Sequence, residues 1–402
     1  METLENNGKA IIEFTVHWLE QDISHQDSTW ADPVSLWRDV LDPELVRGLL
    51  GRGIGGQATV AVPAAQFPRP FDPKKNIAIR PEQFRGQDRF GNDIQLRQGR
   101  YYPQGQLLGV DGVFSVSASP CRFLGSRDDQ LLFDLNHPLA GRDLQLQATI
   151  RAIHDGNRER GGRCEDWLEK VTAGGPGMQS LLAKGQLSQL SAEDLVRTDQ
   201  RPDQLFYKQP RLVHHLDSSA RRAISDLYGR LIPEDARILD LMGSWDSHLP
   251  EDLAFESLTV LGMNEKELRH NTRARKTVVH DLNASPQLPF ADAAFDAVIC
   301  TASIEYLTRP HAVIAEIHRV LRSDGLAAIA FSNRWFPPKA IRVWTQLHDF
   351  ERLGLVADLL AAHGGFHSLS TFSRRGLPRP DDDPHQELPF SDPVYVAWGL
   401  AD

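Results

Sequence analysis

The run ARILDL contains an acidic residue near its end, and the loop behind it carries side chains that can contact a small ligand. Residues 238–250 read ILDLMGSWDSHLP. Asp240 can accept hydrogen bonds, Ser244 can donate one to a carboxylate, and the face of Trp245 attracts a cation by about 0.5–2 kcal/mol. Loops that wrap a pyrophosphate need several glycines for close backbone approach. Gly243 is the single glycine here, so the loop is either a cofactor loop built in another way or an ordinary strand end.

Further polar side chains follow three more apolar runs. Asn264 follows SLTVLGM, Asp281 and Leu282 follow TVVH, and Thr301, Ser303, Glu305 and Tyr306 lie in or after FDAVICTASIEY. In open α/β sheets, ligands bind beyond the carboxyl ends of the strands, where the strand order reverses. These residues are therefore candidates for one shared site.

The elements that position these residues alternate along the second half of the chain. From about residue 206, apolar strands such as ARILDL and LAAIAFSN alternate with helical patterns such as HAVIAEIHRVLRSDG, which ends at a glycine. This alternation predicts an α/β domain with a mostly parallel, doubly wound sheet. Such a sheet would bring the candidate residues together at one edge.

The segment 280–325, HDLNASPQLPFADAAFDAVICTASIEYLTRPHAVIAEIHRVLRSDG, resembles the Rossmann-like (class I) S-adenosyl-L-methionine-dependent methyltransferases. In that family an LPF…FD segment precedes the fourth strand, and a helix with a similar RVL ending precedes the fifth. The similarity covers residues 230–335 well. It implies a Rossmann-like fold, methyl-transfer activity and S-adenosyl-L-methionine as the cofactor.

Carried over by position, the resemblance implies a contact for each part of the cofactor. The methionine part would meet Asp240, Met242, Gly243, Ser244 and Trp245, the ribose would meet Asn264, and the adenine would meet Asp281 and Leu282, with Thr301 and Ser303 also in the cofactor site. The family's loop is written DxGxGxG, and other residues fill all three glycine positions here. S-adenosyl-L-methionine has no phosphates, so a loop with fewer glycines is chemically tolerable. The alternative is a Rossmann-like domain that binds nothing.

Methyl transfer is an in-line displacement, so the protein must align the nucleophile and, where needed, remove its proton. The candidate catalytic residues are Tyr207 and His215 before the first strand, His248 in the first loop, and Glu305 and Tyr306 after the fourth strand. His214 is a further candidate base. In related enzymes the segment before the first strand folds over the cofactor, which favours Tyr207, Arg211 and His215 as lid or substrate residues. The alternatives are solvent-facing histidines, a surface Glu305 and a core Tyr306.

The methyl acceptor is harder to predict. No NPPY-type tetrapeptide, which marks amino-group methylation, follows the fourth strand. The acidic composition disfavours nucleic acid, so a small-molecule acceptor is expected. A thiol or hydrosulfide ionises near neutral pH and demands little base catalysis, which suits a site with no obvious acid–base pair. An oxygen or nitrogen acceptor stays open.

The first part of the chain, residues 1–153, has the alternating texture of strands in IIEFTVHWL, ATVAVP, GVFSVSAS and LQLQATIRAI. Its run LLFDLNHPLAGRDLQLQATI resembles the FK506-binding-protein type of prolyl isomerase, in the branch with an inserted flap. The resemblance implies an α+β, β-rich domain with an insertion at about 67–130, and it places Asp27 near the family's pocket aspartate. The residues that would line the cleft or form the core are Phe14, Trp18, Phe133 and Leu139.

A polar, Gly-rich segment, residues 154–205, is predicted to be a linker with short helices around Trp167–Val171 and Met178–Leu190. Residues 206–402 then form the methyltransferase domain. The first domain would shape the substrate entrance or pair two chains as a homodimer. The competing hypothesis is a prolyl isomerase or chaperone with a vestigial methyltransferase-like domain.

Bulk composition narrows the class of protein. The chain has 402 residues and a net charge of -10, which argues against a dedicated nucleic-acid or anionic-membrane surface. Its three cysteines form no CxxC pair, so neither a disulfide framework nor a metal site is indicated. No apolar run is long enough to span a bilayer, and METLENNGK lacks the pattern of a secretion signal. We therefore expect a cytoplasmic enzyme.

Overall fold

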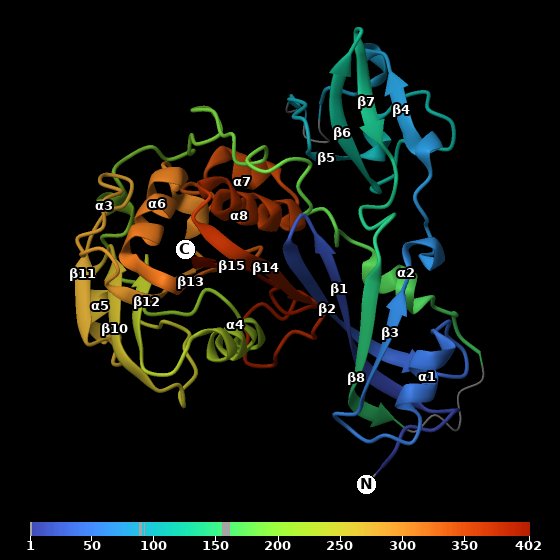
Figure 1. Ribbon diagram of the computed structural model, residues 1–402, viewed down its shortest axis with the longest axis horizontal. Coiled ribbons are helices and arrows are strands. Elements are labelled where there is room, and N and C mark those ends of the chain that lie inside the picture. Colours follow the sequence, from blue (N-terminus) through green and yellow to red (C-terminus); the bar gives the residue numbers. More distant parts are fainter. Residues whose placement is uncertain (1, 88–90, 92, 155–160) are drawn as a thin grey trace. The chain divides into compact units, whose positions relative to one another are not determined.

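The computed structural model describes residues 2–87, 91, 93–154 and 161–402 (Figure 1). Its contacts divide the chain into two compact units. The first contains residues up to 18 together with 32–187, and the second contains 19–31 together with 188–402. The predicted division at 153 and 206 differs from these limits. Each unit is described by itself.

The second unit is built on a sheet whose central strands are parallel. The strands are β9 (Ala236–Leu241), β10 (Phe255–Gly262), β11 (Lys276–Val279), β12 (Phe295–Thr301), β13 (Leu321–Phe331), β14 (Phe366–Arg375) and β15 (Val394–Ala401). Their order is β11-β10-β9-β12-β13-β15-β14, and β15 pairs antiparallel with both of its neighbours. Chain order reverses between β9 and β12, which is the switch point where ligands bind in open α/β sheets. The predicted Rossmann-like sheet is confirmed.

Helices precede β9 and connect β10 to β11, β12 to β13, and β13 to β14. They are α3 (Asp203–Phe206), α4 (Ser218–Leu231), α5 (Glu265–His270), α6 (Pro310–Val320), α7 (Arg342–Gln346) and α8 (Asp349–His363). The predicted helix over 311–325 is shorter than expected, because β13 already begins at Leu321. Within the described residues, no helix combines the length and hydropathy needed to cross a bilayer.

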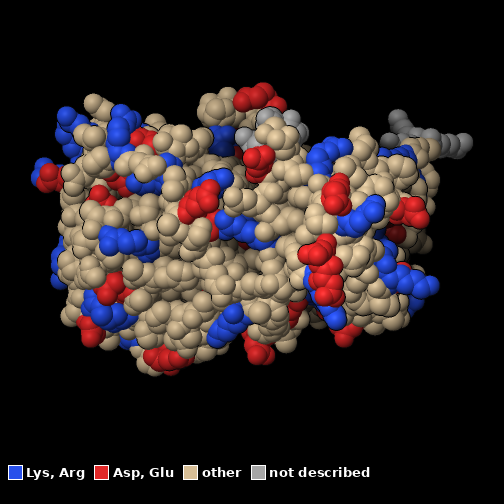
Figure 2. All heavy atoms as spheres, turned by 90° about the horizontal axis from the view of Figure 1, so that it is seen from above, with Lys and Arg blue, Asp and Glu red and all other residues tan. Residues whose placement is uncertain are grey.

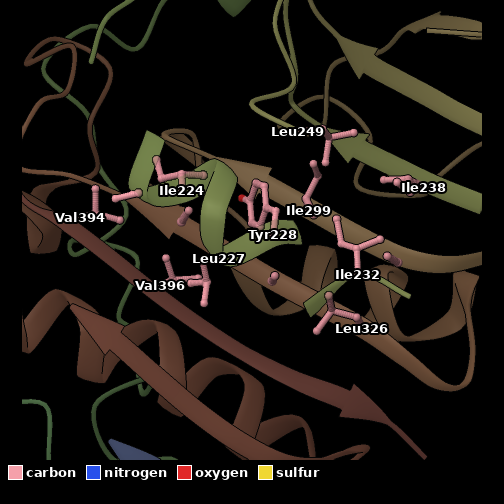
Figure 3. Packing of buried hydrophobic residues seen from close by; sticks show 14 of the residues in the cluster. Ile224, Leu227, Tyr228, Ile232, Ile238, Leu249, Ile299, Leu326, Val394 and Val396 are labelled. Carbon is pink, nitrogen blue, oxygen red and sulfur yellow. The ribbon is translucent and has the colours of Figure 1, made fainter. Parts of the chain in front are cut away.

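Helix α4 shows how the core of the second unit forms. Its N-cap Asp217 accepts a hydrogen bond from the Ala220 N–H at 2.8 Å. The apolar side chains Ile224, Leu227 and Tyr228 lie three or four residues apart, so they share one face and are buried (Figure 3). They pack in one cluster with strand residues from β9, β12, β13 and β15. This face fixes the helix that precedes the first strand of the site.

Strand β2 (Ile23–Ser35) adds to the other edge of this sheet. Its residues Ser24–Thr29 pair in parallel with Ser370–Arg375 of β14. Asp27, expected near an isomerase pocket, is instead buried against β14. Its carboxylate accepts hydrogen bonds from the Ser373 hydroxyl at 2.7 Å and the Arg375 guanidinium at 3.0 Å. The expectation for Asp27 is wrong, because its side chain is already engaged in a charge-assisted pair.

The first unit is strand-rich, as predicted. Strand β8 (Leu144–His154) pairs antiparallel with β1 (Lys9–Glu20) and with β3 (Gln57–Val62), and helix α1 (Pro43–Leu49) contacts β3. A separate antiparallel sheet, β4-β7-β6-β5, comprises Asn76–Ile79, Gln130–Asp134, Pro120–Arg127 and Tyr101–Pro103. This small sheet has its own buried cluster, which includes Phe123 and Phe133. An inserted subdomain therefore lies between β3 and β8 in the chain.

Two predicted elements of the first unit are wrong. GVFSVSAS forms no strand, and its Phe114 and Val116 side chains are exposed. The helix α2 (Trp167–Thr172) is present, whereas residues 178–190 form turns. Alternation and helical spacing over so few residues do not outweigh tertiary contacts. The four aromatic or aliphatic candidates Phe14, Trp18, Phe133 and Leu139 are all buried, as expected for core residues.

Positively and negatively charged side chains are both scattered over the visible face of the molecule. In Figure 2, Lys and Arg are interspersed with Asp and Glu over this face. Among the described residues in that view, no continuous basic stripe stands out of the kind that tracks a phosphate backbone.

Candidate active site

A cavity lies beyond the carboxyl ends of β9, β10, β11 and β12, within the second unit. Its walls come from residues 203–216, from the loop after β9, and from the segments that follow the other three strands. Fourteen predicted site residues line it: Tyr207, His215, Asp240, Met242, Gly243, Ser244, Trp245, His248, Asn264, Asp281, Leu282, Thr301, Ser303 and Tyr306. The shared site expected from the strand ends is therefore present.

The loop after β9 depends on glycine at a position different from the family pattern. The Gly243 N–H donates to the Leu261 carbonyl at 2.9 Å. A Cβ at Gly243 would lie 2.3 Å from Oδ2 of Asp240, and one at Gly262 would lie 2.2 Å from the Gly243 carbonyl oxygen. Met242 takes the left-handed backbone conformation, with φ of 59°. The loop thus approaches β10 closely through Gly243 and Gly262, and no glycine occupies the three usual positions.

Asp240 is the most informative side chain of the cavity. It is 2% exposed, and its Oδ2 has no hydrogen-bond partner among the described residues. Burial raises the pKa of this carboxyl to about 7, although a hydrogen bond from Ser247 and the charge of His248 oppose that shift. Asp240 lines the cavity, and a buried carboxylate oxygen without a partner at such a position suits a ligand that donates hydrogen bonds or carries positive charge.

Two histidines share one carboxylate beside Asp240. Oδ2 of Asp246 lies 3.3 Å from Nδ1 of His248 and 3.5 Å from Nδ1 of His214. Burial alone would raise the pKa of Asp246, but the hydrogen bond and charge of His248 hold it well below its usual range. The Trp245 ring packs against His214, with centroids 4.4 Å apart. Asp246, which stands at a glycine position of the family loop, therefore orients two imidazoles in this structure.

Asn264 has a structural role that the sequence reading missed. Its side-chain oxygen accepts from the N–H groups of Lys266 at 2.9 Å and Glu267 at 3.3 Å, which caps α5. Its amide nitrogen donates to the Tyr207 carbonyl at 2.8 Å. Because the oxygen expected to accept from a ribose hydroxyl is already engaged, the ribose role predicted for Asn264 is not supported by its hydrogen bonds.

Glu267 brings a carboxylate to the same part of the cavity and was not predicted. One of its oxygens accepts from the Ser244 hydroxyl at 2.7 Å, and the other accepts from the Arg211 N–H at 2.6 Å. In the sequence, Glu267 lies three residues after Asn264, a spacing that indicates a helix cap before it indicates a ligand. This spacing is the signal that the sequence offers for Glu267, and it indicates a helix cap.

Hydrogen bonds within the segment after β11, and from this segment to α3, hold it in place. Oδ1 of Asp281 accepts from the N–H groups of Asn283 at 3.0 Å and Ala284 at 3.1 Å, and the Leu282 side chain is buried. The Asn283 amide nitrogen donates to Asp203 at 2.8 Å, so this segment is tied to α3. Asp281 and Leu282 line the cavity as predicted, and Asp203 and Asn283 are further lining residues that were missed.

Asp203 anchors the segment that covers one side of the cavity. It accepts hydrogen bonds from Arg197 at 2.9 Å, and Nζ of the fully buried Lys339 lies 3.0 Å from its other oxygen. Burial opposes ionisation, but these cations and Asn283 lower the pKa of Asp203 below its usual value. The helix α3 that leads to Tyr207 is therefore fixed by a buried ion cluster.

Tyr207, Arg211 and His215, predicted as lid or substrate residues, all line the cavity. The Arg211 guanidinium lies 5.2 Å from the ring of Phe336, and the His215 ring meets the same phenylalanine edge-on at 5.0 Å. Burial raises the pKa of Tyr207 well above its usual value and lowers the pKa of His215. Near neutral pH, Tyr207 therefore keeps its proton and His215 is neutral.

Thr301, the last residue of β12, and Ser303 just after it carry hydroxyl groups with partners inside the protein. The Thr301 hydroxyl lies 2.7 Å from the Tyr228 hydroxyl, and the Ser303 hydroxyl donates to the Thr301 carbonyl at 2.9 Å. Both side chains line the cavity. They couple the cavity wall to the α4 core.

Glu305 is the predicted site residue that the structure places outside the cavity wall. Its side chain is completely buried, and among the described residues its carboxylate oxygens have no hydrogen-bond partner of good geometry. Burial raises the pKa of Glu305 to about 7. The neighbouring Tyr306 faces the cavity, stacks on Phe336 and accepts from its N–H at 2.9 Å. The catalytic role predicted for Glu305 does not fit this position, and neither does the alternative of a surface residue.

Comparisons with known proteins agree with this geometry. Residues 243–329 match the family model of a methyltransferase domain. A stretch of 58 residues is 45% identical to malonyl-[acyl-carrier protein] O-methyltransferase of Laribacter hongkongensis, which is 14% of this chain and 18% of that protein. The match thus spans less than a fifth of the curated relative.

Solved structures with related folds cover about half of the chain. A SAM-dependent methyltransferase of Thermotoga maritima, described as a possible histamine N-methyltransferase, is 16% identical over 48% of this chain and 92% of its own, with a TM-score of 0.35. A methyltransferase of Bacillus halodurans is 14% identical over 46% and 97%, with a TM-score of 0.30. These scores are low, so the fold assignment rests on the strand order. The second unit of this chain carries a methyltransferase domain of the S-adenosyl-L-methionine-dependent class.

Proposed function

We propose that this chain transfers a methyl group from S-adenosyl-L-methionine to a small acceptor. The observation that carries the proposal is Asp240, which lines a cavity at the switch point of the sheet and has a buried oxygen without a hydrogen-bond partner among the described residues. When bound, S-adenosyl-L-methionine supplies a methyl group on a positively charged sulfur, and the C–S electron pair stays with that sulfur when the methyl leaves. The protein must hold the donor and align the acceptor.

The residues of the cavity fit the cofactor part by part. Asp240 would hold the ammonium group, because it offers a buried acceptor oxygen. Glu267 is better placed than Asn264 to accept from the ribose, since each of its oxygens accepts one hydrogen bond and keeps a second lone pair, whereas the Asn264 oxygen already accepts two. Asp281 and the buried Leu282 would meet the adenine. The carboxylates that line this cavity also complement the positive sulfonium.

The acceptor atom is proposed to be ionised at neutral pH or to ionise near it. A carboxylate oxygen is ionised well below neutral pH, and a thiol or hydrosulfide ionises nearer to it. The partial relative from Laribacter hongkongensis is an O-methyltransferase by name, which supports keeping oxygen acceptors in the proposal. Such acceptors require at most a weak base, which agrees with a cavity where Tyr207 keeps its proton and Glu305 is absent from the wall.

A transfer assay tests the proposal. The full chain is incubated with S-adenosyl-L-methionine labelled on its methyl group and with thiols, sulfide, carboxylic acids, amines and phenols in turn. We expect labelled product with at least one thiol or acid, and a loss of about tenfold or more for Asp240→Asn. Label in no product, together with no binding of S-adenosylhomocysteine, would contradict the function.

We also propose that the first unit has the FK506-binding-protein type of fold, as a module that controls substrate access or pairs two chains. Three features support it: the antiparallel β1-β8-β3 strands, the four-stranded insertion, and NHPLAG, which follows that insertion. Since Phe14, Trp18 and Leu139 are core residues, we expect no isomerase activity. A prolyl-peptide isomerisation assay on the full chain checks this, and sedimentation equilibrium checks pairing.

A further inference from the structure

A second cavity adjoins the first within the second unit. It lies beside the segment that follows β13 and is closed on another side by the loop between β14 and β15. Its lining residues are His214, His215, Leu216, Ala302, Tyr306, Asn333, Arg334, Trp335, Phe336, Pro337, Asp383, Pro384 and His385. Six of them also line the first cavity: His214, His215, Leu216, Ala302, Tyr306 and Phe336. The two cavities are therefore neighbours that share part of their walls.

The two cavities differ in charge. The first is lined by five carboxylates, Asp203, Asp240, Asp246, Glu267 and Asp281, with Arg211 as its arginine. The second is lined by one carboxylate, Asp383, and one arginine, Arg334. Imidazoles line both cavities: His214, His215, His248 and His280 in the first, and His214, His215 and His385 in the second. The first cavity suits a cation, whereas the second suits a neutral or anionic ligand.

The cation of the second cavity is more weakly paired than its carboxylate. Asp383 lies 3.3 Å from the Arg379 guanidinium, which it shares with Asp217 at 3.3 Å and Asp392 at 3.1 Å. Arg334 lies 3.9 Å from Asp392, and Asp392 already accepts a closer hydrogen bond from Arg379 at 3.1 Å. The Arg334 side chain is 30% exposed and lines the cavity. A guanidinium in this situation can take a ligand carboxylate as a better partner.

Flat apolar surfaces make up another part of the wall. Tyr306 and Phe336 are stacked with centroids 5.9 Å apart, and Phe336 meets His215 edge-on at 5.0 Å. The ring of Trp335 carries the Arg352 guanidinium 4.2 Å from its centroid. Aromatic walls of this kind favour a planar ligand, since offset-stacked and edge-on ring pairs are the preferred geometries.

His214 lies at the junction, because it lines both cavities. Its Nδ1 faces the ionised Asp246, which leaves Nε2 as the nitrogen available to take a proton. Burial lowers the pKa of His214, so the imidazole is neutral near pH 7. A neutral, carboxylate-oriented imidazole at the boundary is suited to accept the proton of an acceptor's thiol or hydroxyl group.

We propose that the second cavity binds the methyl acceptor and that this acceptor is a small aromatic acid. Its carboxylate would pair with Arg334, its ring would lie along Tyr306 and Phe336, and its thiol would face the junction. There the acceptor gives its proton to Nε2 of His214, its sulfur forms the new bond to the methyl carbon, and the donor's C–S bond breaks with its electron pair left on the donor's sulfur. This inference rests on the proposed methyltransferase function.

The test uses a matched pair of probes, 4-mercaptobenzoate and its neutral analogue 4-mercaptobenzamide. Each is titrated by calorimetry into the full chain saturated with S-adenosylhomocysteine. We expect the acid to bind about tenfold more tightly than the amide, and Arg334→Gln to remove that preference while amide binding stays within twofold. Arg230→Gln, an exposed arginine on α4, is the matched control and should keep the preference.

The outcomes separate the two proposals. Binding of S-adenosylhomocysteine with equal affinity for acid and amide, or a preference that survives Arg334→Gln, would overturn the acceptor inference alone. Failure of S-adenosylhomocysteine to bind would overturn the methyltransferase function and this inference with it. As an activity readout, Arg334→Gln is expected to raise KM for the acid about tenfold with little change in kcat.

Discussion

Two buried carboxyl groups, at the ends of neighbouring strands of one sheet, differ in whether they can meet a ligand. Asp240 in β9 and Glu305 after β12 are both buried, both have an oxygen without a good partner among the described residues, and both have a pKa raised to about 7 by burial. Asp240 lines the cavity at the switch point, whereas Glu305 lies outside its wall. A raised pKa shows that burial disfavours the ionised form of a carboxyl group. Only a carboxyl group that also lines a cavity can contact a ligand there.

The largest effect on cofactor binding is expected from Gly243→Ala, which displaces the residues packed around Asp240. The added Cβ would lie 2.3 Å from Oδ2 of Asp240 and 2.7 Å from Val260, so the loop must move. We expect binding of S-adenosylhomocysteine to weaken by about 100-fold or more, measured by calorimetry. Gly86→Ala, where the added Cβ meets nothing within 4 Å, is the control. Wild-type affinity in Gly243→Ala would show that the cofactor does not depend on this loop.

The second prediction concerns how the free energy of unfolding depends on pH at Glu305, the buried carboxyl group that lies outside the cavity wall. Its pKa rises from 4.5 to about 7 on folding, so between these values the folded state holds a proton that the unfolded state has released. Stability is therefore lost as pH rises from about 4.5 to about 7, by about 3 kcal/mol for this group. Glu305→Gln removes this loss.

Urea unfolding at pH 5 and pH 8 measures that effect. The variant should gain stability over the wild type at pH 8 relative to pH 5, and S-adenosylhomocysteine binding should stay within twofold. An equal difference in unfolding free energy at both pH values would show that Glu305 is ionised in the folded protein at pH 5.

A smaller effect is expected at Asn264, whose side chain caps α5. Asn264→Ala removes the acceptor for the Lys266 and Glu267 N–H groups, so the free energy of unfolding should fall by about 1 kcal/mol. Asn264→Asp retains a capping oxygen and should restore most of that loss. If instead the alanine variant keeps its stability and loses cofactor affinity, the ribose role first predicted for Asn264 is supported.

Much of the second unit could be predicted from the sequence. Apolar strands alternating with helices predict a parallel sheet, and the carboxyl ends of its strands necessarily meet, so most candidate residues proved to share one cavity. Resemblance to known methyltransferases identified the cofactor class. The first unit was read correctly as strand-rich, and its separate small sheet lies largely within the predicted insertion.

Other features could not be predicted, for physical reasons. Chain direction does not show whether a residue just after a strand, such as Glu305, faces the cavity or the core. The loop after β9 lies so close to β10 that a side chain would not fit at Gly243 or Gly262. No residue spacing in the sequence indicates this close approach. Other walls of the second cavity come from Asn333–Pro337 and Asp383–His385, which lie outside the matched segment and meet it only in the folded chain.

The most direct measurement titrates S-adenosylhomocysteine into the wild type, Asp240→Asn and Glu305→Gln by calorimetry at pH 6 and pH 8. If the ligand's ammonium group meets Asp240, the wild type must ionise this carboxyl on binding, so its affinity should rise between pH 6 and pH 8. Asp240→Asn should bind at least about tenfold more weakly and lose that pH dependence, whereas Glu305→Gln should match the wild type. Wild-type binding by Asp240→Asn, or no binding by the wild type, would contradict the account.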